Sequence, residues 1–175
     1  ITSRFLLAGA PVEVITACHP KIDAVATRIT SPLASAGRLA LQVLFPYASS
    51  GISAADFNAA GKHQSRLVVS ATDLARIERK LDAMTYSTRL AWRGAGLLQQ
   101  AADHDFRLVP SAGTLEVVAA FDESQQLGPL PPVAEVLQAS TRRWNDYWNS
   151  GAALDLGGCT DTRAPELERR IVLSQ

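Results

Sequence analysis

A period-two alternation of side-chain character dominates the chain as far as about Phe121. In the segment Thr85–Trp92, Tyr86, Thr88, Leu90 and Trp92 fall on one side, with Ser87, Arg89 and Ala91 opposite. Successive side chains of an extended strand point to opposite faces, so this pattern is typical of a half-buried antiparallel strand. No helix-length pattern lies between such segments, which argues against a parallel sheet of βαβ units.

Short alternating segments recur along the first two thirds of the chain, separated by Gly, Pro, Ser and Asp. About nine or ten strands at such short spacing indicate a β-sandwich or a β-barrel. The strands we expect are Val12–Cys18, Asp23–Ile29, Arg38–Phe45, Ser65–Ser70, Ala75–Leu81, Thr85–Trp92, Leu97–Ala102, Phe106–Pro110 and Thr114–Phe121.

One connection is much longer than the others. It runs from Pro46 to Gly61, is rich in Ala, Ser and Gly, and leaves room for a short helical turn within Ile52–Ala60. Loops of this length are uncommon unless they are functional or mobile. We therefore regard this loop, and His63 beside it, as a candidate functional region.

The period changes near Gly128, where the proline-rich stretch Leu127–Pro132 predicts a stiff linker. From Val133 to Trp148 the apolar residues recur at helical spacing, and Gly151 follows the expected helix end. A second helix is expected from about Thr162. We predict a β-sandwich over residues 1–127 and a linker with helices over residues 128–175. The chain begins with Ile1 and its second helical pattern still runs at Gln175, so we expect a piece of a longer polypeptide.

The composition of the chain argues against several classes of protein. The 175 residues include 17 basic and 17 acidic side chains, 47% are hydrophobic and 19% are charged. This is enough apolar material for a core and argues against intrinsic disorder. No run of Lys or Arg indicates a nucleic-acid partner or a polybasic membrane-surface role. No stretch approaches the ~18 consecutive apolar residues of a membrane span. We expect neither nucleic acid nor membrane as a partner.

Metal and catalytic motifs are absent from the linear sequence. Cys18 and Cys159 lack the paired spacing of a zinc site; a single disulfide stays open, and two free thiols are favoured. Asp103-His104-Asp105 resembles a capped turn more than a metal corner. A Ser-His-Asp triad is recognised only by geometry and stays open, although no Gly-x-Ser-x-Gly elbow is present. We predict no metal and no organic cofactor.

Acidic residues do not identify a general acid either. Glycoside hydrolysis needs an acid and a base some 5–10 Å apart. No spacing marks any of the candidates as that acid; these are Asp73, Glu78, Asp82 and Glu116. We predict no catalytic residue in the chain.

The densest aromatic cluster is Trp144-Asn145-Asp146-Tyr147-Trp148. Its rings could form a sugar-stacking platform, or they could dock the helix onto the sandwich or a neighbouring domain. Helical spacing favours docking, because aromatic side chains dominate buried contact energy. For a carbohydrate ligand, the predicted binding residues are Trp144, Trp148 and His63.

Several stretches resemble one enzyme family. The most specific lie near the C-terminal end of the chain: Arg143–Trp148, Gly151–Leu156 and Thr160–Gln175. Four upstream stretches fit the same picture: Val14–Pro20, Arg28–Pro32, Phe45–Tyr47 and Leu81–Tyr86. Together they resemble the junction in six-hairpin, (α/α)6-barrel glycoside hydrolases that carry an N-terminal β-super-sandwich of the galactose-mutarotase type.

This resemblance implies an antiparallel β-super-sandwich followed by a C-terminal linker helix and a truncated second helix. The family's general acid and base lie in the helical barrel, so the resemblance places no catalytic residue in this chain. It implies an accessory domain, inactive alone, whose partners are the C-terminal helical barrel and an oligosaccharide or polysaccharide. The parent enzyme would be periplasmic or secreted, and a loop such as Ala48–Gly61 would reach toward its active-site rim.

Two other functions stay open. A stand-alone carbohydrate-binding module would expose two or more of Trp92, Trp144 and Trp148 on one flat face. A mutarotase-like epimerase would bring a histidine (His19, His63 or His104) onto an Asp or Glu in a cleft.

Overall fold

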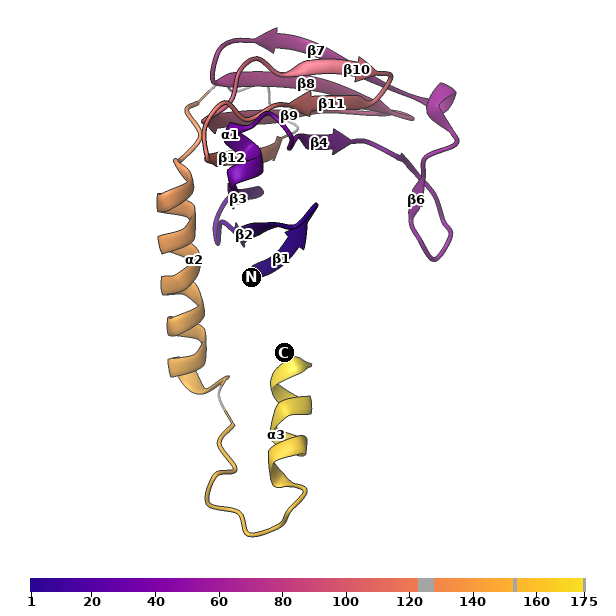
Figure 1. Cartoon of the computed structure of the whole chain (residues 1–175). Coiled ribbons are helices and arrows are strands. Elements are labelled where there is room, and N and C mark those ends of the chain that lie inside the picture. The colour runs from indigo at the N-terminus through magenta and orange to yellow at the C-terminus, as the bar shows by residue number, and fades with distance from the viewer. Residues whose placement is uncertain (123–127, 153, 175) are drawn as a thin grey trace.

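The computed structural model describes residues 1–122, 128–152 and 154–174. The chain is mainly β and forms three layers: a small sheet, a large sheet and the helix α2 (Figure 1). All strand pairs are antiparallel. This confirms the predicted fold class. The predicted domain boundary at residue 127 and the chain end at Gln175 lie outside the described residues.

The large sheet has seven strands in the order β1-β2-β3-β12-β9-β8-β7. The pairing of β3 with β12 joins the N-terminal strands to the strands that come later in the chain. The strands are β1 (Thr2–Leu7), β2 (Ala10–Cys18), β3 (Ala24–Thr30), β12 (Thr114–Asp122), β9 (Met84–Arg93), β8 (Leu74–Leu81) and β7 (His63–Ser70).

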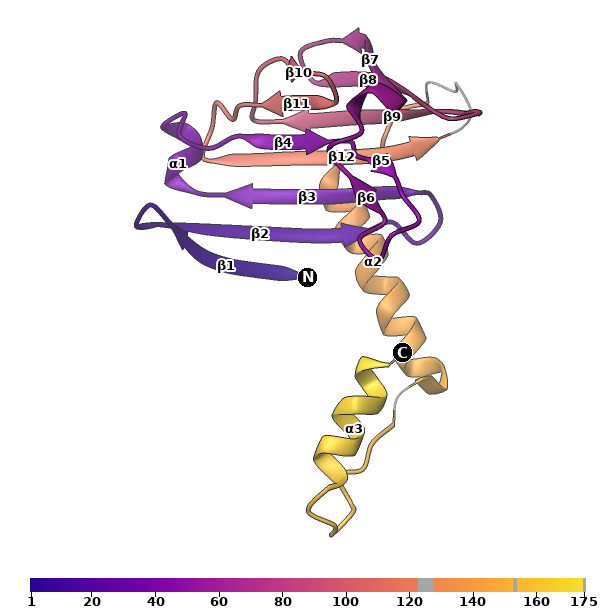
Figure 2. The same ribbon diagram turned by 90° about the vertical axis from the view of Figure 1, so that its right-hand side faces the viewer.

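The small sheet covers one face of the large sheet on the β7–β9 side. Its order is β10 (Gln99–Ala102), β11 (Asp105–Leu108) and β4 (Leu41–Leu44) (Figure 2). Phe106 and Leu108 of β11 are buried against Ile77 and Leu90 of the large sheet. The predicted alternation in Thr85–Trp92 is confirmed, because Thr88, Leu90 and Trp92 are all buried.

Helix α2 (Val133–Tyr147) covers the opposite face over β2, β3 and β12. The strand residues beneath it are small, mainly Ala24, Ala26 and Ala120, so the helix approaches closely and buries Val133 and Val136. The second half of α2 runs past the sheet in both views (Figures 1 and 2). A π-helical segment (Trp148–Ala152) and helix α3 (Ala164–Leu173) follow, away from the sheet.

The long connection differs from its prediction. The expected helical turn over Ile52–Ala60 is wrong: the segment forms a small hairpin of β5 (Tyr47–Ala48) and β6 (Ala55–Asp56). Ala54 turns the chain with a φ of 52°, and its carbonyl accepts the Ser49 N–H at 3.2 Å. A short 3-10 helix, η1 (Ala60–Lys62), then leads into β7.

Besides β5, β6 and η1, strand β1 and helix α1 (Pro32–Ser35) were not predicted either. Strand β1 escapes alternation analysis because consecutive apolar residues, Phe5, Leu6 and Leu7, occupy an exposed edge. Helix α1 is a single turn, capped by the Ser31 side chain on the Leu33 N–H. Strands β10 and β11 are also shorter than expected. Cys18 and Cys159 are exposed free thiols.

Candidate functional site

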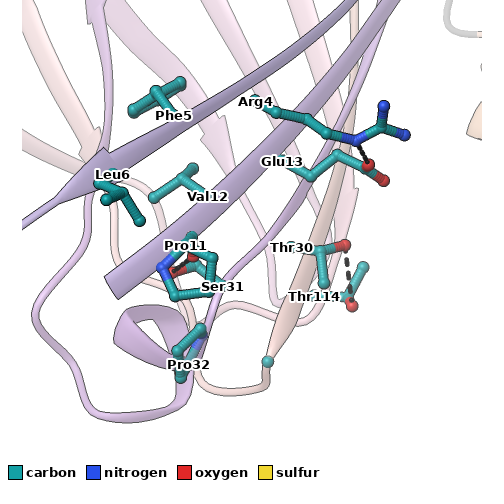
Figure 3. Close-up of a pocket in the computed structure, with 11 residues that line it drawn as sticks. Arg4, Phe5, Leu6, Pro11, Val12, Glu13, Thr30, Ser31, Pro32 and Thr114 are labelled. Carbon is teal, nitrogen blue, oxygen red and sulfur yellow. Dashed lines mark hydrogen bonds and ion pairs between the residues drawn. The ribbon is translucent and has the colours of Figure 1, made fainter. Parts of the chain in front are cut away.

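An apolar groove lies at the β1 edge, where the small sheet does not reach. It has a volume of about 820 Å³, and β1, β2, the start of α1 and the turn before β12 line it (Figure 3). Phe5, Leu6 and Val12 supply side chains from the first two strands, with Pro11 and Pro32 at one end. All six residues of β1 are exposed.

Polar groups of the groove pair with each other. Arg4 donates to the Glu13 carboxylate, and the Thr30 and Thr114 hydroxyls lie 3.5 Å apart across neighbouring strands. Phe5 is the one aromatic residue among the lining residues. A groove with an apolar lining and internally paired polar groups suits the apolar side chains of a partner protein better than the hydroxyl-rich surface of a sugar.

A buried polar cluster lies at the other side of the molecule, between β7, β8 and the β10–β11 turn. Arg79 of β8 is 1% exposed, and its Nη1 donates to His63 Nδ1 at 2.8 Å. The same nitrogen donates to the Ser65 hydroxyl and lies 3.4 Å from His104 Nδ1. The guanidinium also lies over the Phe45 ring, 4.6 Å from its centroid.

The two histidine rings of this cluster stack on one another. Their centroids are 3.7 Å apart at an interplanar angle of 15°. Because a guanidinium only donates, His63 Nδ1 is an acceptor and that ring carries its proton on Nε2. His104 Nε2 lies 3.0 Å from the Ala60 carbonyl and donates to it, so His104 Nδ1 accepts from Ser65 Oγ at 2.6 Å. The His63 ring is therefore neutral.

Electrostatics favour the neutral form of His63. Burial lowers its pKa below the usual 6.5, and the nearby His104 and Arg79 lower it further. None of the described acceptors of Arg79 is a carboxylate. The positively charged guanidinium of Arg79 therefore holds the cluster together by donating hydrogen bonds to neutral acceptors.

An acidic residue beside this cluster and the remaining histidine have separate partners. Asp105, next to His104, is bonded to Gln42 and Arg107 rather than to a histidine. His19 accepts backbone N–H groups at the end of β2. Within the described residues no histidine hydrogen-bonds to an Asp or Glu, although His63 and Asp82 line the same small cavity. A mutarotase-like epimerase therefore stays a prediction.

A serine–histidine pair does occur within the cluster, between Ser65 and His104. Next to it is a cavity of only about 120 Å³, lined by His63, Lys62 and Asp82 but not by Ser65 or His104. The Ser65 hydroxyl also accepts a hydrogen bond from Arg79. This pair is a structural contact and not a nucleophile facing a substrate.

Three of the four acidic candidates from the sequence lie in separate pairs, whereas the fourth, Asp73, is exposed and lines a cavity of about 480 Å³ together with Glu116. Glu78 bonds to Arg66 at 3.0 Å, Glu116 to Arg28 at 2.7 Å, and Asp82 accepts the Tyr47 hydroxyl at 2.9 Å. That hydrogen bond raises the pKa of Tyr47.

Among the described residues, every carboxyl group whose pKa departs from its ordinary value has a lowered pKa. Hydrogen bonds from Arg107, Arg163 and Arg169, respectively, lower the pKa of the three carboxyls concerned, Asp105, Asp161 and Glu166. A general acid needs the opposite shift, toward a raised pKa.

The tryptophans divide between core and surface. Trp92 is buried, and its Nε1 donates to the Gly96 carbonyl at 2.9 Å. Trp144 is 52% exposed on the part of α2 beyond the sheet, and its ring centroid lies 5.6 Å from that of Tyr147 and 6.4 Å from that of Trp148. The Trp144 and Trp148 rings stack at 24°, whereas Tyr147 meets both edge-on.

The aromatic cluster of α2, defined as Trp144, Tyr147 and Trp148, thus packs on itself. The α2 residues that pack on the sheet are Val133, Val136 and Leu137, so docking of these aromatics onto the sandwich is wrong as an expectation. The stacked and edge-on rings do not form one flat platform. Their predicted contact with carbohydrate stays a prediction.

Arg79, the centre of the buried polar cluster, was not among the candidate residues named from the sequence. The signal was present in the alternation, because Ala75, Ile77 and Arg79 share the buried face of β8. A charged residue at an inward position of a strand indicates a buried polar network.

Nothing in the described ranges brings three or more His, Cys, Asp or Glu side chains together as metal ligands. Within the same ranges, no helix has the length and hydropathy needed to cross a membrane. No protein-family model matches the chain, and no curated protein is found as a relative.

Proposed function

We propose that this chain is the accessory β-sandwich of a glycoside hydrolase and docks onto a helical catalytic barrel. The observation that carries the proposal is the division of α2. Its first turns bury Val133 and Val136 on the sheet, whereas its last turns hold an aromatic cluster beyond it. A helix with one buried end and one unpartnered aromatic end is suited to join two bodies.

Helix α3 supports the same reading. Its residues Leu167 and Leu173 are exposed, and Val172 is exposed to a lesser degree. Its charged residues pair among themselves, as Glu166 bonds to both Arg169 and Arg170 at 2.8 Å. Apolar residues left on the surface beside self-paired charges form a face suited to a helical neighbour. The exposed Leu6 and Phe5 of the groove offer a second contact surface.

The paired carboxylates support an accessory rather than a catalytic role. Glu78 and Glu116 each bond to an arginine of a neighbouring strand, and Asp82 accepts the Tyr47 hydroxyl. Proton donation to a glycosidic oxygen needs a carboxyl that is free to carry a proton at the working pH. As the resemblance implies, we propose that two carboxylates of the barrel carry out the chemistry, with no metal or organic cofactor, in a parent that is periplasmic or secreted.

The test compares this chain with the longer product of the same gene on aryl glycosides and oligosaccharides. We expect hydrolysis by the long product only. The barrel region, expressed separately, should bind this chain in a pull-down with purified components. Trp144→Ala should weaken that binding at least tenfold, with Met84→Ala, at the exposed first residue of β9, as the matched control. A reading frame that ends near Gln175 would overturn the proposal.

The second candidate is a stand-alone carbohydrate-binding module, and the exposed Trp144 ring is the observation that favours it. Stacking of a pyranose on that ring would quench its fluorescence. Saturable quenching by an oligosaccharide in the wild-type chain, lost in Trp144→Ala and kept in Trp92→Phe, would support the module. Absence of quenching at millimolar sugar would exclude it.

A further inference from the structure

We propose that the buried cluster of His63, His104 and Arg79 is a pH-sensitive latch that holds both ends of the 46–61 loop against the sandwich and releases the loop on acidification. The inference is independent of the glycoside hydrolase proposal. It depends on three features: where the loop ends are bonded, which ring nitrogens accept, and which charges surround them.

Both ends of the loop are bonded to the cluster. At the first end, Arg79 Nη2 donates to the Pro46 carbonyl at 3.3 Å, and the Tyr47 ring centroid lies 5.9 Å from that of His63. At the second end, His104 Nε2 donates to the Ala60 carbonyl at 3.0 Å. The loop between these points pairs mainly with itself, through β5 and β6. Its described attachments to the sandwich are these bonds and the hydrogen bond from the Tyr47 hydroxyl to Asp82.

Protonation reverses the role of the atoms that hold Arg79. His63 Nδ1 accepts from the guanidinium at 2.8 Å, and a proton on that nitrogen would place two N–H donors against each other. A charged ring would also stack 3.7 Å from its neighbour and beside a buried guanidinium. The latch therefore closes only when the His63 ring is neutral.

The charges around the cluster are mainly positive. Lys62 lies over the Tyr47 ring, 5.4 Å from its centroid, and Lys80 shares the small cavity with His63. Asp82, the carboxylate in that cavity, is engaged by the Tyr47 hydroxyl, and Asp105 beside His104 is engaged by Arg107 and Gln42. The titratable and charged groups facing the two rings are thus Arg79 from β8, Lys62, Lys80, Asp82, Tyr47 and Asp105.

The direction of the pH effect follows from the lowered pKa of His63. Above pH 6.5 the ring is neutral whether the latch is closed or open, so pH has no effect. Below 6.5 the open form takes up a proton first, which favours opening until the pH reaches the lower pKa of the closed form. The latch is weakened as pH falls.

Amide hydrogen exchange, measured separately at each pH, reports the opening of the loop directly. The protection factors of amides in residues 47–62 are compared at pH 7.5 and pH 5, with β3 amides as the internal reference. We expect protection in the loop to fall by about tenfold, with a ceiling of about 30-fold for one histidine of ordinary pKa 6.5, while β3 stays protected.

Two variants separate the latch from general acid sensitivity. His63→Gln keeps an acceptor for Arg79 but does not titrate, and should retain loop protection at pH 5. His19→Gln is the control, because His19 lies at the end of β2 outside the cluster, and should keep the wild-type pH response. Ring proton NMR of His63 gives a second readout that does not require a variant.

The proposal is overturned if loop protection is the same at both pH values, or if His63→Gln responds to pH as the wild type does. It is also overturned if His63 titrates at or above pH 6.5 by NMR. A fall in protection shared equally by the loop and β3 would report global unfolding and would likewise contradict a local latch.

Discussion

The two edges of the large sheet are completed in opposite ways. On the β7–β8 side a second sheet lies over the inner face, and even a charged residue, Arg79, is buried with partners for its donors. On the β1 side no second sheet covers the strands, and Leu6 is 72% exposed. A charged side chain, Arg79, is therefore buried where the chain supplies partners for it, and an apolar side chain, Leu6, is left in solvent where no second sheet covers it. We call these the closed edge and the open edge.

Matched aromatic truncations should show the largest difference between the edges. Phe106→Ala at the closed edge removes a side chain that is 0% exposed and meets the Phe45 ring edge-on. We expect a loss of about 4 kcal/mol in the free energy of unfolding. Phe5→Ala at the open edge should cost below about 1 kcal/mol. Urea denaturation followed by circular dichroism measures both, and equal losses would abolish the distinction.

Removal of the buried guanidinium should come next in size. Arg79→Ala leaves His63 Nδ1 and the Pro46 carbonyl without their donor, and we expect a loss of about 3 kcal/mol. Arg66→Ala, in the neighbouring strand, removes an exposed ion pair with Glu78 and should change stability by below about 1 kcal/mol. The same denaturation experiment applies. A small effect of Arg79→Ala would mean that the cluster does not seal the closed edge.

A glycine between the two sheets offers a smaller test. Gly94 has a φ of +83°, and a Cβ there would lie 2.2 Å from the Thr114 carbonyl oxygen. Gly94→Ala should therefore lower the unfolding free energy by about 2 kcal/mol, because backbone strain and a backbone clash act together. Gly96→Ala, which meets nothing within 4 Å, is the control. The thermal midpoints of the two variants should differ clearly, with Gly94→Ala the lower.

The smallest stability effect is expected at the open edge. Leu6→Lys places a charge on the exposed edge strand and should change the unfolding free energy by no more than about 0.5 kcal/mol. It should nevertheless reduce self-association at high concentration, since lysine on an edge opposes strand addition. Sedimentation velocity at increasing concentration tests this. Association that is unchanged by Leu6→Lys would show that contacts between copies do not use β1.

The sequence was informative wherever a segment has one buried face. In β9, Thr88, Leu90 and Trp92 turn inward as the alternation predicted. Strand β1 could not be found this way, because an edge strand with neither face buried has no reason to alternate. The helix over Val133–Tyr147 was predictable from its apolar spacing and from the proline before it.

Long-range pairing set the limit for the candidate site. His63 was noticed only because it flanks a long loop, and His104 only as a turn residue, which its φ of 63° confirms. Their stacking depends on the β10–β11 turn folding back over β7, a contact between residues 41 positions apart. No local pattern encodes that contact. Arg79 was accessible to sequence reasoning in principle, because it occupies an inward position of β8.

Helix α2 also sets the geometry of anything attached to it. A helix advances about 1.5 Å and turns about 100° per residue, so its 15 residues span about 22 Å. One residue inserted after Leu137 would keep the sheet contact of Val133 and Val136 but swing the aromatic cluster about a quarter turn around the axis. Four residues inserted there would restore nearly the same direction while moving the cluster about 6 Å outward. The number of residues in α2 thus sets both the position and the orientation of any neighbour that binds through the cluster.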